Sequence, residues 1–268
     1  MNRLRALAAF LKRDLLIEAS YRTSFIMQFA GIFLSVLIWR FVSGVMKASP
    51  DTPGLEGIDY FAYVLLGLAF FHYLSSAMGS FSVKIRQEQV TGTLEAILMT
   101  PTSPGTVVLG SALWEFVVAS IKVVIYLTVG WLFGVAFHFE TLPLCFLVLA
   151  LTVLAFSGIG ILSAAFIFYL KKGDPITYLV SSVSVLLGGV FYPTEDMWPW
   201  LGRLSKFLPI TYALHAWRHA LLKGSRLQDI LPDIGALLLF VVILLPLGGL
   251  AFRFAVRRAR EEGSLVQY

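Results

Sequence analysis

Long apolar runs separated by short polar segments dominate this chain. Six of the runs come close to, or exceed, the roughly 20 residues that a helix needs to cross a membrane. We therefore predict an all-α polytopic membrane protein, with residues 1–268 forming a single transmembrane domain. The predicted membrane spans cover residues 23–45, 60–81, 107–136, 142–170, 175–192 and 233–254.

The N-terminal segment has a different pattern. Apolar residues recur there at helical spacing and form one stripe, made of Leu4, Leu7, Ala8, Leu11 and Leu15. Basic residues supply the opposite side, at Arg3, Arg5, Lys12 and Arg13. Such an amphipathic helix lies in the plane of the membrane interface. We predict an interfacial helix over residues 2–20.

A polar segment at residues 88–101 lies between the second and third predicted spans. Gly92 can take a positive φ, so the segment begins with a turn. Thr93 can cap a short helix, which Pro101 would end. The pattern predicts a short helix parallel to the membrane plane, and a solvated turn between helices is the alternative.

Residues 193–223 contain two apolar stripes that are too short to cross a membrane, with Pro199 and Pro209 before them. Aromatic side chains that prefer the membrane–water interface flank them, at Trp198, Trp200, Tyr212 and Trp217. We predict an external re-entrant or interface-lying helical hairpin. Its basic residues are expected to reach outward to lipid head groups, and they are Arg203, Lys206, Arg218, Lys223 and Arg226.

The composition agrees with a membrane protein, because 58% of the residues are hydrophobic and only 14% are charged. Soluble domains carry about 25% charged residues. The net charge of +5 does not indicate nucleic-acid binding, since the basic residues sit mainly at the ends of apolar runs. Lys and Arg gather in the loops that six spans place on the side of both termini, which predicts cytoplasmic termini. The basic residues of the hairpin depart from this rule.

Three ionisable residues, Arg40, Glu115 and Lys122, lie inside predicted spans. Charged groups are costly in lipid and are functional candidates for that reason. Arg40 is near the end of its span, where a long side chain can reach the interface. Glu115 and Lys122 are seven residues apart and share one helix face. They either line a substrate path or pin their helix to another span.

Small residues at helical spacing, Gly130 with Gly134 and Gly160 with Ala164, predict close contacts between helices of the chain. Chemistry carried by the chain itself is not favoured. The sequence has no G-x-x-x-x-G-K-[ST] phosphate loop, so a separate subunit would have to hydrolyse ATP. His215 and His219 are four residues apart but lack the glutamate of a zinc-binding H-E-x-x-H motif. We expect no catalytic, cofactor-binding or metal-binding residue in this chain.

The run from Glu88 to Pro101 resembles the cytoplasmic motif of ABC-2 type permeases, the membrane subunits of a class of ABC exporters. A second resemblance begins at residues 188–193, continues through 208–214 and includes Arg218. It matches the end of the family's fifth span and its external hairpin. The resemblance covers essentially the whole chain.

The resemblance implies a transport subunit of a prokaryotic inner membrane that is not itself an enzyme. It implies two permease copies, as a homodimer, and an ABC ATPase subunit that binds ATP and Mg, with lipids as the remaining contacts. The implied ATPase-coupling residues are Glu88, Gln89, Gly92, Thr93, Leu94, Glu95, Thr100 and Pro101. The implied hairpin residues are Pro193, Pro209, Tyr212 and Arg218. An ion-driven secondary carrier and a membrane enzyme acting on lipid-linked substrates are the alternatives.

Overall fold

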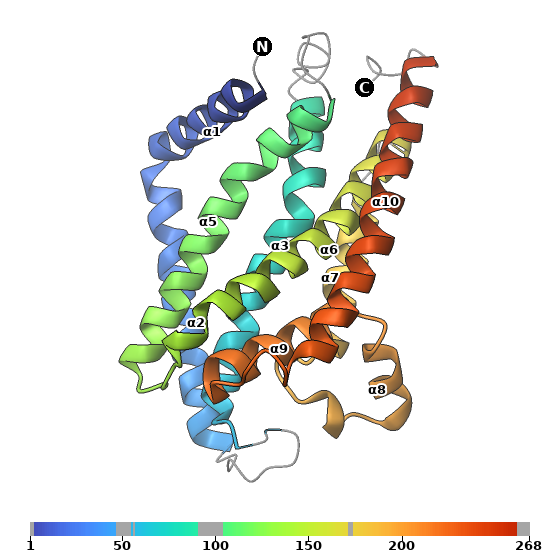
Figure 1. Cartoon of the computed structure of the whole chain (residues 1–268). Coiled ribbons are helices and arrows are strands. Elements are labelled where there is room, and N and C mark those ends of the chain that lie inside the picture. The colour runs from blue at the N-terminus through green and yellow to red at the C-terminus, as the bar shows by residue number, and fades with distance from the viewer. Residues whose placement is uncertain (1–2, 47–54, 56, 91–103, 171–173, 262–268) are drawn as a thin grey trace.

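A computed structural model describes residues 3–46, 55, 57–90, 104–170 and 174–261, and all regular structure in these residues is helical (Figure 1). The α-helices are α1 (Arg3–Ser20), α2 (Arg22–Met46), α3 (Tyr60–Val90), α5 (Pro104–Leu132), α6 (Leu142–Leu170), α7 (Pro175–Leu187), α8 (Pro199–Ser205), α9 (Pro209–Lys223) and α10 (Leu231–Glu261). Two short 3₁₀ helices, η1 (Phe139–Thr141) and η2 (Thr194–Asp196), precede α6 and α8. The predicted all-helical class is confirmed.

The long helices α2, α3, α5, α6 and α10 run between two ends of the molecule (Figure 1). The end that holds α1 and the last turns of α10 is called the terminal end here. The opposite end holds α8 and α9 and is called the hairpin end. Helix α1 lies across the terminal end, and the chain turns into α2 at Tyr21, whose N–H donates to the Glu18 carbonyl at 3.0 Å.

Five helices of the described chain are long and apolar enough to cross a membrane, at Ile26–Val45, Tyr60–Ser80, Leu113–Leu132, Phe139–Ile167 and Leu231–Arg258. The helix α7, at the predicted fifth span, has only 13 residues. It ends before Gly188, and Gly189 then takes a φ of +78°, which turns the chain. The predicted helical span over 175–192 is therefore too long, and the count of six spans stays a prediction.

Two helices continue past their predicted ends. Helix α3 extends to Val90 rather than 81, and α10 extends to Glu261 rather than 254. Helix α5 begins at Pro104 and ends at Leu132 rather than 136, followed by Gly134 with a φ of +90°. The extension of α3 means that the predicted coupling segment begins inside a helix that is continuous with a membrane span.

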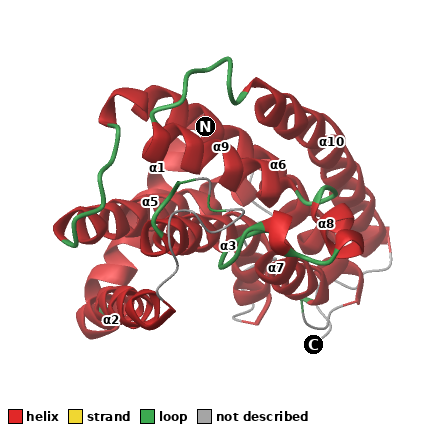
Figure 2. Ribbon diagram, turned by 90° about the horizontal axis from the view of Figure 1, so that it is seen from below, coloured by secondary structure: helices red, strands yellow, loops and turns green. Residues whose placement is uncertain are grey.

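Helix α3 lies in the middle of the bundle, where it contacts α2, α5, α6, α7 and α9 (Figure 2). Of its apolar span, 78% is buried within the chain, compared with 11% for α2 and 17% for α10. The buried side of α3 includes Leu66, Phe70, Leu74 and Met78, and Phe70 packs on Trp217 of α9 at a ring distance of 5.3 Å. Helix α3 is the central member of the core.

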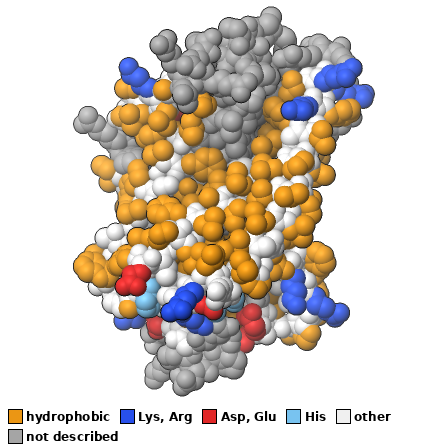
Figure 3. Space-filling model, viewed as in Figure 1, with side chains coloured by type: hydrophobic (Ala, Val, Ile, Leu, Met, Phe, Trp, Pro, Cys, Tyr) orange, Lys and Arg blue, Asp and Glu red, His pale blue; other side chains and the backbone are white. Residues whose placement is uncertain are grey.

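The outer surface carries a broad apolar band with charged side chains toward both ends (Figure 3). On α10, Leu247, Leu250 and Phe254 are more than half exposed. Exposed apolar area of this extent is costly in water and is typical of a surface that faces lipid. The band therefore supports a multi-pass membrane protein.

Helices α6 and α10 cross at two glycines. A Cβ on Gly158 would lie 2.6 Å from the Leu244 carbonyl carbon, and a Cβ on Gly248 would overlap the Gly158 carbonyl oxygen. The two backbones touch directly, which is the kind of contact that small residues permit in membranes. This crossing was not among the predicted small-residue contacts. The predicted contact site Gly130 packs against Leu65 of α3.

Replacing Gly248 with alanine should destabilise the protein by about 1 kcal/mol, because the added methyl forces α6 and α10 apart. The cost is at the low end for overpacking, because lipid covers the helix surfaces that separate. Gly249 provides a matched control, since a Cβ there meets no atom within 4 Å. We expect a lower unfolding temperature in detergent for Gly248→Ala and an unchanged or higher one for Gly249→Ala. Equal temperatures for the two variants would contradict the close crossing.

Candidate functional site

Polar groups converge at the hairpin end, around a cavity of about 730 Å³. The end of α7, the 3₁₀ helix η2, α8, α9 and the first turns of α3 and α10 enclose it. Its ionisable lining residues are Tyr63, Glu195, Arg203, Lys206, Tyr212, His215, Arg218, His219 and Asp233. We call this space the hairpin cavity.

Local sequence features fix the helix that forms the cavity floor. Pro209 occupies the first turn of α9, where its missing N–H costs nothing. Gly224 ends the helix with a φ of +65°, a conformation that glycine adopts without strain. Near that end, Thr141 donates to the Ala220 carbonyl at 2.8 Å, and the His138 N–H donates to the Leu221 carbonyl at 2.9 Å. The α5–α6 connection thus holds the C-terminal end of α9.

The turn between α8 and α9 is held by two side chains of α9. The Thr211 hydroxyl donates to the Ser205 carbonyl at 2.8 Å, and the Tyr212 hydroxyl donates to the Lys206 carbonyl at 3.0 Å. Both bonds cap carbonyls that the end of α8 leaves without a helical partner. They orient α8, and with it Arg203 and Lys206, over the cavity.

Arg218 is buried, with only 4% of its surface exposed. Its Nε and Nη2 atoms donate to the Tyr63 carbonyl at 3.2 and 3.0 Å. Its Nη1 atom donates to the Gly189 carbonyl at 2.8 Å, and Nη2 donates also to the Val190 carbonyl at 3.0 Å. The expectation that Arg218 reaches outward to head groups is therefore wrong, because this side chain points into the protein and joins α9 to α3 and to the end of α7.

Backbone carbonyls, rather than a carboxylate, accept the hydrogen bonds of this buried charge. The Gly189 and Val190 carbonyls follow the C-terminal end of α7, where the helix dipole is negative. The guanidinium carbon also lies 3.3 Å from the centre of the Tyr63 ring. Burial lowers the pKa of the Arg218 guanidinium, and Tyr63 and Glu195 oppose that shift. Arginine titrates so far above neutrality that the group stays charged.

Tyr63 and Gly67 lie one turn apart on the face of α3 that receives Arg218. The Tyr63 hydroxyl donates to the Gly189 carbonyl at 3.0 Å. A Cβ on Gly67 would overlap the Val190 carbonyl oxygen and lie 2.7 Å from Nη2 of Arg218. We call Tyr63, Gly67, Gly189, Val190 and Arg218 the arginine clamp. Its members Tyr63, Gly189 and Arg218 line the hairpin cavity.

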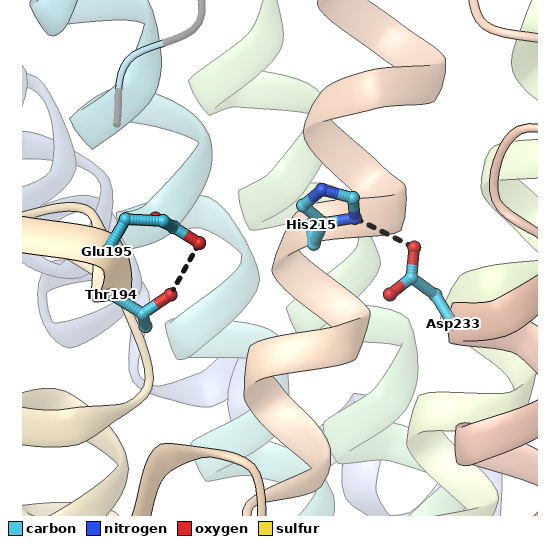
Figure 4. A network of polar contacts seen from close by, with 4 residues as sticks. All are labelled: Thr194, Glu195, His215 and Asp233. Carbon is cyan, nitrogen blue, oxygen red and sulfur yellow. Dashed lines mark hydrogen bonds and ion pairs between the residues drawn. The ribbon is translucent and has the colours of Figure 1, made fainter. Parts of the chain in front are cut away.

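Two further polar pairs face the cavity (Figure 4). His215 Nδ1 lies 2.8 Å from an Asp233 carboxylate oxygen, which links α9 to the first turn of α10. The Thr194 hydroxyl donates to the Glu195 carboxylate at 3.0 Å. The rings of His215 and His219 lie 4.1 Å apart. Within the described ranges, no group of three His, Cys, Asp or Glu side chains is arranged to hold a metal ion.

The other predicted hairpin residues lie around the same structure. Pro193 is buried directly before η2, and Pro209 is buried at the start of α9. Tyr212 is partly buried and lines the cavity. The hairpin region thus places Tyr212 and Arg218 on one wall, with the two prolines at the turns.

The three intramembrane candidates are not brought to one place. Arg40 lies in the last two turns of α2 and is exposed, with its guanidinium carbon 5.4 Å from the centre of the Phe61 ring. It lines a second cavity of about 400 Å³. Glu115 and Lys122 are half-buried in the middle part of α5.

Among the predicted coupling residues, Glu88 and Gln89 belong to the last turn of α3. The others, Gly92, Thr93, Leu94, Glu95, Thr100 and Pro101, lie outside the described residues. The helices that flank them, α3 and α5, both reach the terminal end (Figure 1), where α5 packs on α1. Phe10 of α1 packs on Gly110 of α5 at this end.

Sequence reasoning missed Tyr63, Gly67 and Asp233. Tyr63 and Gly67 are four residues apart and therefore share a helix face, which was a usable signal. The acceptors for Arg218 are backbone carbonyls, which leave no mark in a pattern of side chains. Asp233 is the first residue of the predicted last span, 233–254, where a polar residue is expected to mark the end of the membrane-spanning segment.

Comparison with known proteins agrees with this architecture. The sequence pattern of the ABC-2 type transporter family matches residues 5–222. Nodulation protein J of Neorhizobium galegae is 28% identical over 197 residues, covering 70% of this chain and 71% of that protein. The inner membrane transport permease YadH of Escherichia coli K12 is 25% identical over 188 residues, which are 70% of this chain and 73% of that protein.

The probable multidrug ABC transporter permease YbhR of Escherichia coli K12 is 22% identical over 234 residues. That match covers 84% of this chain and 63% of YbhR, so this chain spans less than two thirds of that relative. The family match extends from the first turn of α1 to the last turn of α9 and includes Arg218. The chain therefore belongs to the ABC-2 type transporter family and is a multi-pass membrane subunit of a transporter.

Proposed function

We propose that this chain is the permease subunit of an ATP-driven exporter in a prokaryotic inner membrane. Two copies form the substrate path, and each copy couples through residues 88–101 to a separate ABC ATPase subunit that binds ATP and Mg. The terminal end faces the cytoplasm, and the hairpin end faces outward. The names of two relatives, which call them permeases, support this kind of protein.

The observation that carries the proposal is the course of α3. This helix has 31 residues, so it is about 45 Å long. One end leads into the coupling segment after Val90, and the other end carries Tyr63 in the arginine clamp. Because α3 is buried among five other helices, a push at its terminal end displaces it as a rigid body rather than bending it.

Helix α5 supplies a second connection from the same place. It begins at Pro104, just after the coupling segment, and packs on both α1 and α3. Force applied between Val90 and Pro104 therefore reaches two neighbouring membrane helices together. Helix α1 lies across this end and would add contact area for a soluble partner.

The orientation can be tested with single cysteines. Cys145 is the only native cysteine, so Cys145→Ser gives a cysteine-free background. In that background we expect Asp229→Cys, at the exposed hairpin end, to react with a membrane-impermeant maleimide in intact spheroplasts. Ser103→Cys should react only after lysis. The reverse pattern would remove the proposed coupling, because the coupling segment would then face away from any ATPase.

Coupling itself can be tested at Gly92. Replacing Gly92 with valine penalises the positive φ predicted for the turn, at about 1–3 kcal/mol. After reconstitution with an ABC ATPase that co-purifies with the wild-type chain, we expect permease-stimulated ATP hydrolysis to fall about tenfold. Gly249→Ala is the control, since its site lies on α10 with open space around it. Unchanged stimulation, or transport that survives ATP depletion and stops with a protonophore, would contradict the proposal.

A further inference from the structure

Two cationic side chains at the rim of the hairpin cavity are not paired with a carboxylate of the described residues. Both belong to the α8 region, at Arg203 and Lys206, and both are exposed. Arg203 uses only Nε, which donates to the Pro199 carbonyl at 3.4 Å. Among the described residues, no carboxylate lies within ion-pair distance of either side chain. Their remaining donors are therefore available to a ligand in the cavity.

The same short helix places these cations at the depth of lipid head groups. Trp198 and Trp200 are 69% and 51% exposed, and Leu204 and Phe207 are 46% and 76% exposed. Tryptophan prefers the interface between hydrocarbon and water, and large apolar side chains exposed beside it indicate contact with lipid. Helix α8 and the residues next to its two ends thus carry an apolar surface for the membrane beside basic groups that line a cavity.

The charge of the cavity wall favours an anion. Arg218 adds a third permanent cation to the cavity lining, and its buried position weakens screening by solvent. The lining contains two carboxylates, Glu195 and Asp233. Asp233 is engaged by His215, and Glu195 accepts a hydrogen bond from Thr194. The permanent cations therefore outnumber the carboxylates, and one of those carboxylates is already partnered by an imidazole.

We propose that the hairpin cavity binds the anionic head group of a membrane amphiphile from the leaflet at the hairpin end. A phosphate of the head group lies between Arg203 and Lys206, and its acyl chains leave past the aromatic side chains of α8. The volume of about 730 Å³ is in the range of small-molecule sites and exceeds the need of a bare phosphate ion. This inference does not depend on coupling to an ATPase.

The test uses the purified full-length protein in a neutral detergent, titrated with dioctanoyl phosphatidylglycerol by thermophoresis. We expect binding at least about tenfold tighter than that of dioctanoyl phosphatidylcholine, which has no net charge, or of inorganic phosphate. Arg203→Gln and Lys206→Gln should each weaken phosphatidylglycerol binding about tenfold, since each removes a charge-assisted contact. Arg226→Gln, on an exposed loop at the same end, should change it less than about twofold.

Both rim residues are exposed, so their substitution should leave the unfolding temperature unchanged, and a measured drop in binding then reports the site itself. Wild-type affinity in an Arg203→Gln, Lys206→Gln double variant would overturn the proposal. Equal affinity for inorganic phosphate and phosphatidylglycerol would also overturn it, by showing a site for free anions. An equal loss of phosphatidylglycerol binding in Arg226→Gln would overturn it as well, by showing that the binding depends on general surface charge and not on the cavity. These outcomes can be distinguished from a failure of ATPase coupling, because coupling is measured separately as permease-stimulated ATP hydrolysis.

Discussion

Replacing Arg218 with methionine is expected to lower the free energy of unfolding by about 3–4 kcal/mol, the largest effect of any substitution considered. Methionine fills a similar volume but donates no hydrogen bond, so the carbonyls of Tyr63, Gly189 and Val190 each lose the guanidinium as a donor in a buried place. Each buried carbonyl left without a partner costs about 1–3 kcal/mol. Part of that cost is offset, because the Gly189 carbonyl keeps the Tyr63 hydroxyl. The Tyr63 carbonyl lies inside α3 and keeps the Gly67 N–H, one turn along the helix, as its helical donor. The measurement is unfolding of the purified protein in detergent.

Two companion variants separate the hydrogen bonds from the charge. Arg218→Lys keeps a positive charge, but a single ammonium cannot reproduce the planar fork that reaches three carbonyls, so we expect about half the loss. Arg226→Met removes an arginine from the exposed loop before α10 and should change stability by less than about 0.5 kcal/mol. If Arg218→Met unfolded like the wild type, apolar packing alone would hold α9 on α3, and the arginine clamp would have no structural role.

The membrane class was readable from the sequence, because burial in lipid imposes long apolar runs that no other environment requires. The end of α7 was not readable. The apolar run continues through Val190 and Phe191, so hydrophobicity gave no sign that the helix stops at Leu187. The stop comes from backbone geometry, with Gly189 at positive φ, and from the carbonyls that this turn presents to Arg218.

The hairpin shows why the basic residues of one segment have to be treated one by one. Sequence reasoning gave Arg203, Lys206 and Arg218 the same outward direction. Arg218 lies four residues after Leu214 and three before Leu221, so it falls on the buried stripe of α9. This helical position indicates that Arg218 is buried, but the free-energy cost of burying a charge argues against that interpretation. The cost is met by backbone carbonyls, which sequence patterns do not reveal.

The candidate site as a whole was partly foreseeable. Pro209, Tyr212 and Arg218 were singled out by resemblance, and they lie in or beside the wall of the hairpin cavity. The cavity itself depends on how α3, α7 and α10 approach this hairpin, and those helices are far apart in sequence. Asp233 and His215 meet across 18 residues only because α10 starts beside α9. Pairings of this kind are set by tertiary packing and not by local spacing.

Replacing Gly67 with alanine is expected to destabilise the protein by about 2–3 kcal/mol, although alanine favours helices more than glycine does. The added methyl would overlap the Val190 carbonyl oxygen and crowd Nη2 of Arg218. Overpacking of a buried site typically costs about 1–3 kcal/mol. The upper part of that range applies here, because moving Val190 or Arg218 away also stretches the hydrogen bonds between them. Chemical unfolding in detergent measures the change.

Gly79 is the matched control for this prediction, since it lies three turns further along α3. Among the described side chains, the contact that a Cβ there would make is with a Val83 methyl at 3.8 Å, an ordinary van der Waals distance. Gly79→Ala should be neutral or slightly stabilising, through helix propensity alone. A double variant then tests whether Gly67 acts through the arginine clamp. Residues that share contacts are not additive, so Gly67→Ala combined with Arg218→Met should cost clearly less than the sum of the two single changes. Full additivity would mean that Gly67 matters for helix packing in general, and that the close approach of α3 to Val190 does not serve the arginine.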